Sequence, residues 1–319
     1  MDGLVSVALA TFNGKKYLQE QLDSIYNQTY KHIEVIVSDD ASNDQTIDLL
    51  NEYKSKHGLK YYKNDKNLGF ISNFQKAIEH CTGDYIALAD QDDIWHPNKI
   101  EKLLKNIGSK PLICSDALVI DSNGNVLSES LSDYAKLKFF YQDQFKYLLF
   151  GNFVPGCTML FKKELKEYIL PISKNFPFHD WWIALVTATM GGIAFCDEPL
   201  MMYRRHDSNC SLTAHPEKQN GSNITKKITD VISDIKTNGY NGKVQLLKSL
   251  LQYNFFTNEY KQFIRDTIEF YEGMVYAKIP IKSTMYALRN RKYICAKRNK
   301  ALQWIFALGT IALPILKKL

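Results

Sequence analysis

Three aspartates crowd into four positions of the segment "YIALADQDDIWHPNKI" (residues 85–100), directly after an apolar run. One aspartate there could form a turn or cap the helix that Pro97 suits. Three carboxylates so close together, Asp90, Asp92 and Asp93, repel one another, and burial makes that repulsion more costly. A divalent cation among them would relieve it. The cluster therefore predicts a site for a metal ion or a polar ligand.

The elements that must position this cluster follow from two alternating periodicities in the first 120 residues. Short β-rich apolar runs alternate with segments in which apolar residues recur at helical spacing. Such alternation predicts an α/β fold, a mostly parallel sheet covered by helices on both faces. The expected strands cover residues 5–10, 33–38, 59–62, 85–89 and 112–120, and the expected helices cover 15–28, 44–57, 70–81 and 97–107.

Polar residues follow four of these expected strands. Each group could be an ordinary turn or cap sequence. That interpretation does not explain why all of them fall at the same edge of the sheet, where ligands of such folds bind. The groups are Thr11 to Gly14, the segment "SDDASNDQT" with Asp39, Asp40, Ser42 and Asp44, the segment "KNLGF" with Asn67 and Gly69, and the acid cluster itself.

The chain lacks the glycine motifs of two nucleotide sites that are common in this fold class. A dinucleotide site needs G-x-G-x-x-G after the first strand, where this chain has only Gly14. The chain also lacks the G-x-x-x-x-G-K-[ST] loop. A nucleotide held through carboxylates and a bridging Mg²⁺ fits the residues better.

Composition sets broader limits. The chain has 319 residues, of which 45% are hydrophobic and 23% charged, so it suits one large domain with an appendage, or two domains. Its six cysteines form no C-x-x-C pair, which argues against a zinc site or a disulfide framework and favours reduced thiols in a cytosolic protein. Residues 1–14 are expected to contain the first strand and not a signal peptide.

Positive charge is concentrated in the last part of the chain. From Lys278 onward there are ten Lys and Arg and no acid, so with a total of +6 the first 277 residues sum to −4. The part with the acid cluster therefore does not need a polyanion such as nucleic acid as its partner. Within the basic part lies the apolar segment 301–316. It is too short to span a bilayer, because a spanning helix needs about 20 residues. It is either a buried helix or, as its basic flanks favour, a helix lying on an anionic membrane surface.

Taken in order, several segments resemble family-2 glycosyltransferases. They are "VALATFNGKKYLQEQLDSIYNQTY", "IEVIVSDDASNDQT", "NLGF" and "GDYIALADQDDIW" within residues 4–107, then "GNFVPGCTMLF", "FHDWWIALVTATMGG" and "DEPLMMYRRHDSN" at 151–161, 178–192 and 197–209. The resemblance implies the GT-A fold and transfer of a sugar from a nucleoside diphosphate with inversion. It implies a catalytic domain over 1–210, with a nucleotide-sugar half up to about 120 and an acceptor half from 121. A helical extension over 211–300 and a membrane-associating tail over 301–319 would follow.

The resemblance also implies roles for individual residues. Asp180 is expected to be the general base, and Asp92 with His206 to hold Mg²⁺ or Mn²⁺. The expected donor-binding residues are Thr11, Asn13, Asp40, Asp44, Gly69, Asp90 and Arg204. Plainer alternatives remain at this stage: Asp180 could cap a helix, His206 could be a surface histidine, and Arg204 could be a solvated charge. For Trp95, Trp181 and Trp182, core packing is expected.

"DQDDIW", "HDWW" and "YRRH" look like the rhamnosyltransferase-like branch, which implies dTDP-rhamnose as donor. The expected acceptor is a polyprenol-linked glycan or a polysaccharide of the bacterial cell surface, reached from the cytoplasmic face of the membrane. Another UDP- or dTDP-sugar, or a nucleotide-sugar binding module without catalysis, remains an alternative. A glycoside hydrolase also uses paired acids, but it needs no nucleotide site. A nucleotidyltransferase would carry a Gly- and Arg/Lys-rich loop after its first strand, which is absent here.

Overall fold

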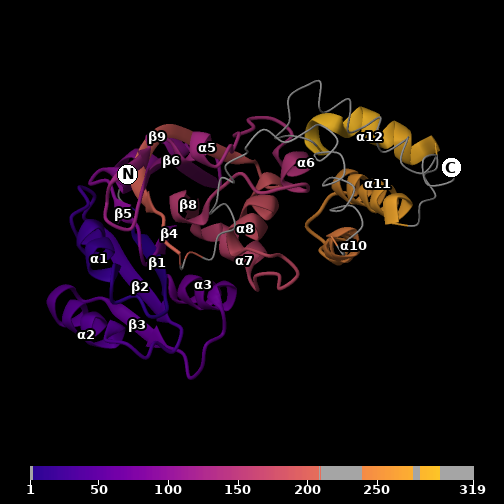
Figure 1. The fold of residues 1–319 in the computed structure, drawn as a ribbon. Coiled ribbons are helices and arrows are strands. Elements are labelled where there is room, and N and C mark those ends of the chain that lie inside the picture. Colours follow the sequence, from indigo (N-terminus) through magenta and orange to yellow (C-terminus); the bar gives the residue numbers. More distant parts are fainter. Residues whose placement is uncertain (1–2, 208, 210–238, 276–280, 295–319) are drawn as a thin grey trace. The chain divides into compact units, whose positions relative to one another are not determined.

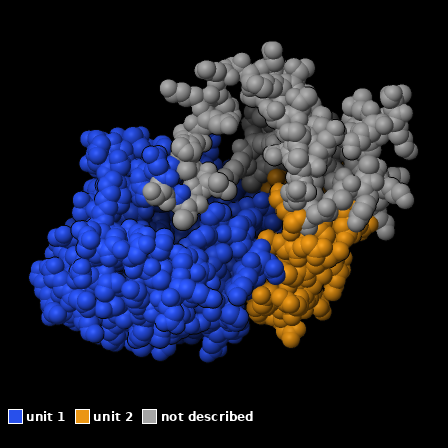
Figure 2. Space-filling model, turned by 60° about the horizontal axis from the view of Figure 1, so that its bottom comes forward, with its two compact units in different colours: residues 1–214 blue, residues 215–319 orange. Residues whose placement is uncertain are grey.

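A computed structural model describes residues 3–207, 209, 239–275 and 281–294. The chain divides into two compact units, Met1–Ala214 and His215–Leu319, shown in blue and orange in Figure 2. The two units are described separately below.

Within the described residues, unit 1 is built on one nine-stranded sheet (Figure 1). The strand order is β3-β2-β1-β4-β8-β6-β9-β5, and β7 pairs with β6. β1 pairs in parallel with β2 and β4, and β6 with β9, whereas β8 is antiparallel to both of its neighbours. The strands are β1 Val5–Thr11, β2 Ile33–Asp39, β3 Lys60–Lys63, β4 Tyr85–Asp90, β5 Ile94–Trp95, β6 Leu112–Ile120, β7 Val126–Ser128, β8 Met159–Lys162 and β9 Ile193–Arg204.

The helices of unit 1 connect these strands. The four helices expected before residue 110 are confirmed, with ends shifted by a few residues. Gly58, in the left-handed region at φ +73°, ends α2. The helices are α1 Leu18–Tyr26, α2 Thr46–His57, α3 Phe70–His80, α4 Lys99–Ile107, α5 Leu131–Tyr134, α6 Gln144–Leu148, α7 Lys166–Ile169 and α8 His179–Ala188, with 3₁₀ turns η1 Gly156–Thr158 and η2 Lys163–Leu165.

Both faces of the sheet are covered, as the sequence predicts. Val7 and Leu9 of β1 share one apolar cluster with Leu22 of α1 and Leu103 of α4. Ala8 alternates to the opposite face, where α3 packs on β1 and β2, and it is also fully buried. Because β1 is buried on both faces, its sequence is apolar almost throughout.

The sequence did not predict four strands, β5, β7, β8 and β9. β5, β7 and β8 have two to four residues, too few to show a periodicity. β9 is continuous, but its register with β6 shifts near Pro199, which disturbs the alternation of apolar and polar residues along it. These strands carry the second half of the candidate site.

Unit 2 contains helices α10 Gly239–Leu250, α11 Asn258–Val275 and α12 Ile281–Ile294 in its described part. α11 packs against both α10 and α12. Among the described helices of the whole chain, none is both long and apolar enough to cross a membrane. The predicted tail, 301–319, lies outside the described residues, as does most of the first part of the predicted extension. The described cysteines, Cys81, Cys114, Cys157 and Cys196, are free and buried, as predicted.

Candidate active site

The predicted polar groups meet at one edge of the sheet. Register places Thr11 beside Asp39 and Ala10 beside Asp90, so the ends of β1, β2 and β4 are level. β9 runs in the same direction and ends there at Arg204. Because β8 runs the opposite way, its beginning and the preceding turn η1 lie at this edge too.

The loop after β1 is tied to the acid segment by Gln91, which the sequence analysis did not single out. Its Oε1 accepts hydrogen bonds from Thr11 Oγ1 at 2.6 Å and from Phe12 N at 2.9 Å, and its Nε2 donates to Phe12 O at 3.1 Å. A Cβ on Gly14 would lie 2.4 Å from Gln91 Oε1, so a larger residue there would displace the Gln91 side chain from these hydrogen bonds. Thr11 is therefore 1% exposed and held in place by the residue next to Asp90.

Asn13 and Asp44 lock the loops after β1 and β2 together. Asn13 N donates to Ser42 Oγ at 2.8 Å, and its Oδ1 accepts from Asn43 N at 3.0 Å. Asp44 Oδ1 accepts from Thr46 N at 2.9 Å. Burial opposes the change, but the hydrogen bonds from the side chain and backbone of Thr46 lower the pKa of Asp44.

Asp40 and Gly69, from different predicted groups, are in direct contact. Asp40 Oδ2 accepts from Gly69 N at 2.9 Å, while its Oδ1 accepts from Leu68 N at 2.8 Å and Asn64 Nδ2 at 2.9 Å. Gly69 has φ +82°, a conformation that suits glycine. Asp40 is only 2% exposed, and its hydrogen bonds hold the loop before α3 in place. A donor contact by either residue stays a prediction.

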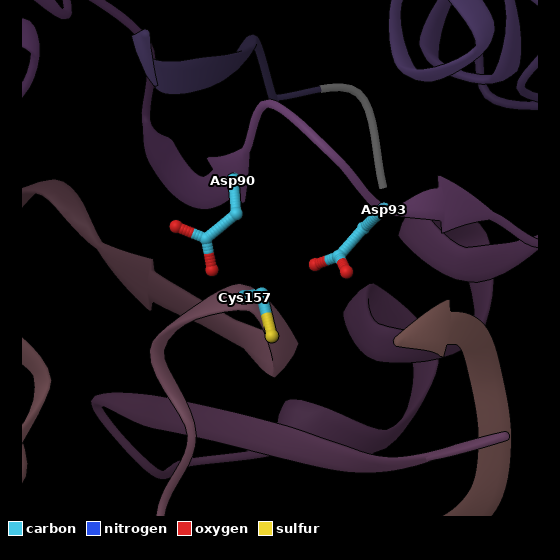
Figure 3. A group of neighbouring side chains, drawn as sticks. All are labelled: Asp90, Asp93 and Cys157. Atoms are coloured by element: carbon cyan, nitrogen blue, oxygen red, sulfur yellow. The ribbon is translucent and has the colours of Figure 1, made fainter. Parts of the chain in front are cut away.

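The three clustered aspartates have separate surroundings. The side chains of Asp90 and Asp93 both extend toward the side where the thiol of Cys157 lies (Figure 3), and one ligand atom from each of the three lies within 4.8 Å of the others. Asp93 is 1% exposed, and its Oδ1 accepts from Arg204 N at 3.0 Å. Its Oδ2 has no hydrogen-bond partner among the described residues.

Electrostatics decide what this buried group can do. Burial first, then the charges of Asp92 and Asp180, raises the pKa of Asp90. Burial and the charges of Asp92 and Asp90 raise the pKa of Asp93 well above its usual range. Burial also raises the pKa of the Cys157 thiol well above its usual range. A bound divalent cation would itself favour the charged carboxylates, so the two aspartates suit Mg²⁺ or Mn²⁺ through their oxygens, whereas the thiol of Cys157 does not.

Asp92 and His206, the predicted metal ligands, are brought together across 114 residues: His206 Nε2 lies 2.8 Å from Asp92 Oδ2. Asn209 Nδ2 lies 3.4 Å from the same oxygen. The ring of Tyr17 stacks on His206 with centroids 5.1 Å apart. The two side chains are 15% and 13% exposed, so an ion can reach them. A carboxylate and an imidazole fit Mn²⁺, and Mg²⁺ less closely. Their metal binding remains a prediction.

Arg204 is not a solvated surface charge, so that alternative is wrong. It is 3% exposed, its Nε donates to Asp92 O at 2.8 Å, and its Nη2 pairs with Glu20 at 2.5 Å. Its guanidinium also lies 4.6 Å from the centre of the Tyr17 ring. In this arrangement Arg204 holds the backbone of the acid segment, and its contact with a donor phosphate stays a prediction.

Asp180 lies in the first turn of α8, whose N-cap residue is Phe178, so it is not the helix cap. Its Oδ2 accepts from Gly156 N at 3.0 Å and its Oδ1 from Trp181 N at 2.6 Å. Burial raises the pKa of Asp180 to about 6, although these hydrogen bonds oppose the change. A carboxylate of that basicity can accept a proton near neutral pH, which suits a general base. That role stays a prediction.

Two buried groups near Asp180 escaped the sequence analysis. His179 stacks on Phe74 at 3.9 Å, and neither ring nitrogen has a hydrogen-bond partner in the described part of the chain. Burial lowers the pKa of His179 to about 3, so the ring is neutral. Lys99, a charged residue after Pro97, is expected on a helix surface but is fully buried. Trp95 and Trp182 are buried at 2% and 0%, as expected for core residues, whereas Trp181 is only partly buried and its Nε1 donates to Leu148 O at 2.6 Å.

Comparison with known proteins agrees with this geometry. Residues 6–169 match the family described as Glycosyl transferase family 2. The chain belongs to this family. It is therefore a glycosyltransferase, and the matched segment covers β1 to α7, including the acid cluster and η1.

Curated relatives of this glycosyltransferase include proteins of bacteria and of an archaeon. The chain is 28% identical to an uncharacterized glycosyltransferase of Haemophilus influenzae over 248 residues, 73% of this chain and 77% of the relative. It is 29% identical over 237 residues to the dTDP-rhamnosyl transferase RfbG of Shigella flexneri, covering 69% of this chain and 75% of the relative.

Solved structures show the same fold at low identity. S. aureus TarS 1–349 in complex with UDP-GlcNAc aligns with a TM-score of 0.57 at 15% identity, covering 91% of this chain and 81% of TarS. The mannosyltransferase PcManGT of Pyrobaculum calidifontis, in complex with GDP-Man and Mn²⁺, aligns with a TM-score of 0.53 at 17% identity, covering 98% and 81%. At such identities the likeness shows the GT-A-like fold alone.

Proposed function

We propose that this glycosyltransferase uses a nucleoside diphosphate sugar, transfers the sugar with inversion, and employs Asp180 as general base. One observation carries the proposal. The carboxyl group of Asp180 is fixed by two backbone N–H groups, has its pKa raised to about 6, and lies close enough to Asp90 to raise the pKa of that group. A base is thus held beside the carboxylate cluster at the ligand-binding edge of the sheet.

The reaction follows from this placement. As the acceptor oxygen forms its bond to the anomeric carbon, its proton passes to the carboxylate of Asp180. The bond from the anomeric carbon to the diphosphate oxygen breaks with its electron pair, and the nucleoside diphosphate leaves from the opposite face. One displacement of this kind inverts the configuration.

Asp92 and His206 would hold the divalent cation, since a carboxylate and an imidazole lie in contact there with side chains that are 15% and 13% exposed. When bound, such an ion neutralises the diphosphate as negative charge develops on it. Thr11, Asn13 and Asp44 would orient the nucleobase and the ribose of the donor, because hydrogen bonds within these loops already fix the positions of the three side chains.

For the donor we propose dTDP-rhamnose, and for the acceptor a polyprenol-linked glycan or a surface polysaccharide. The support is the "HDWW" and "YRRH" pattern together with the identity of 29% to a dTDP-rhamnosyl transferase. The alternatives are another UDP- or dTDP-sugar, or a binding module without turnover.

A donor panel tests the proposal. The melting temperature of the full chain is measured with dTDP-rhamnose, dTDP-glucose, UDP-GlcNAc and GDP-mannose, each with Mn²⁺, with Mg²⁺ and with EDTA. A ligand bound only by the folded state raises the melting temperature as its concentration exceeds Kd. We expect the largest rise with dTDP-rhamnose and Mn²⁺, and slow release of dTDP by hydrolysis. If the chain binds a donor but releases no nucleotide, with or without an acceptor, the proposed catalysis is wrong and the chain is a nucleotide-sugar binding module.

We further propose peripheral attachment to the cytoplasmic membrane surface through the basic, apolar end of the chain, of which α12 is described and residues 295–319 lie outside the described residues. The ten basic residues from Lys278 and the apolar segment 301–316 support it. A chain ending at Lys300 should bind anionic liposomes less in co-sedimentation and keep donor hydrolysis. Equal pelleting of both chains would overturn the proposed attachment.

A further inference from the structure

Lys99 is a fully buried lysine at the start of α4. Its Nζ donates to Cys157 O at 2.6 Å, lies 3.3 Å from Met201 Sδ and sits 3.9 Å from the centre of the Trp95 ring. Burial lowers the pKa of Lys99 to about 8, while the charges of Asp93 and Asp90 oppose the change. The ammonium is therefore largely charged at neutral pH.

Packing does not explain a charge at this position. An ammonium group loses much of its hydration when it is buried, and an apolar side chain of similar volume would avoid that cost. What the ammonium supplies is a strong donor toward one carbonyl oxygen and a positive charge near Asp90 and Asp93.

The carbonyl that Lys99 binds belongs to the turn that holds the proposed base. Cys157 is the middle residue of η1, and Gly156 before it donates its N–H to Asp180 Oδ2 at 3.0 Å. The turn has little freedom, because a Cβ on Gly156 would lie 3.0 Å from His179 Nε2 and 3.1 Å from Asp180 Cβ. Lys99 and Asp180 thus bind adjacent residues of one short turn.

We propose that Lys99 is a positioning residue, which anchors η1 from inside the protein and thereby fixes the carboxylate of Asp180. This inference rests on the proposed function of Asp180 as the base.

Lys99→Met tests the proposal, with Lys102→Met as its matched control. Lys102 lies one turn away on the same helix, is about one-third exposed and pairs with Glu198. The assay is nucleoside diphosphate release from dTDP-rhamnose, or from UDP-GlcNAc if that is the donor that turns over. Because small misplacement of a catalytic group costs up to about 10²-fold, kcat should fall roughly 10- to 100-fold in Lys99→Met with KM within about twofold. Lys102→Met should retain the wild-type kcat.

Two further readouts separate positioning from a general structural defect. In the Asp180→Asn background, Lys99→Met should cause no further loss of kcat, because groups that act as a unit are not additive. Amide hydrogen exchange of a peptide covering 154–160 should become faster in Lys99→Met, with other core peptides unchanged. If Lys99→Met does not fold, Lys99→Gln replaces it in both measurements, because its shorter, uncharged side chain weakens the hydrogen bond to Cys157 O, and the same changes are expected at smaller size.

Unchanged exchange of the 154–160 peptide would overturn the inference and leave the proposed function standing. A loss of kcat that multiplies with that of Asp180→Asn would also overturn it. If Asp180→Asn alone retained the wild-type kcat, the proposed base would fail. The exchange measurement would then still decide whether Lys99 anchors the turn.

Discussion

Two parts of the proposed active site differ in whether their buried polar groups have hydrogen-bond partners. After their proposed roles, we call them the donor loops, residues 11–14, 39–46 and 64–69, and the catalytic edge, formed by Asp90 to Asp93, η1 and the start of α8. In the donor loops, Asp40 accepts hydrogen bonds from two backbone N–H groups and from Asn64. At the catalytic edge, Asp93 Oδ2 and both ring nitrogens of His179 have no hydrogen-bond partner in the described structure.

This difference separates the preorganised part of the site from its reactive part. Hydrogen bonds from backbone amides favour the charged form of Asp44 and rigidify its loop. Burial near like charges instead disfavours the charged forms of Asp90 and Asp180. Shifts of that kind are concentrated where a protein performs proton transfer. Substitutions in the two regions should therefore fail differently.

The largest effect is expected for Asp180→Asn. Removing a general base should lower kcat by about 10²- to 10⁴-fold, while donor affinity in calorimetry stays within about twofold. The neutral amide avoids the cost of a buried charge but can accept only one of the two N–H bonds, from Gly156 or from Trp181, so the free energy of unfolding should change little. The folded-state pKa of Asp180 is raised from 3.8 to about 6, so the wild type should lose stability relative to this variant as pH rises through that window. A near-normal kcat would show that another residue is the general base.

Asp40→Ala should damage the fold before the chemistry. It leaves the partly buried N–H groups of Leu68 and Gly69 without their acceptor, which should lower the free energy of unfolding by about 1–3 kcal/mol. Urea unfolding measures this, and Asp65→Ala, an exposed aspartate in the same loop, should change it by less than about 0.5 kcal/mol. Equal stabilities of the two variants would erase the contrast between the regions.

Asp92→Ala sharpens the contrast at the exposed side of the cluster. We expect the gain in dTDP affinity on adding Mn²⁺ to fall by about 10- to 100-fold, because one of two proposed ligands is lost. Affinity measured in EDTA should not change. Asp207→Ala, next to His206 but exposed, is the control and should behave as wild type. A Mn²⁺ effect that survives in Asp92→Ala would assign the ion to other residues.

The pH profile is the smallest and most specific test. The base must be unprotonated to act, so log kcat should rise by about one per pH unit below about pH 6 and level off above it. This limb should vanish in Asp180→Asn. A limb near pH 4 would show that Asp180 ionises as an ordinary carboxyl during catalysis.

The sequence alone determined the first half of the fold and the chemical character of its edge. Apolar runs and helical spacing located β1 to β4, β6 and α1 to α4, because local periodicity reports which face each residue buries. Parallel strands must end at the same edge, so Thr11, Asp40 and Asp90 could be grouped without coordinates. The motifs after residue 150 placed Asp180 and His206 only through resemblance to a family.

Only the tertiary structure decided which polar groups touch and which are buried. The pairing of Asp92 with His206 spans 114 residues and depends on β9 running beside β6. The burial of Lys99 depends on η1, whose Cys157 O accepts its hydrogen bond, and nothing in the sequence around Lys99 distinguishes it from the partly exposed Lys102. Desolvation is a property of the assembled site, because it requires neighbours from distant segments. The raised pKa of Asp180 and the burial of Lys99 are therefore products of the fold, although every residue type involved is visible in the chain.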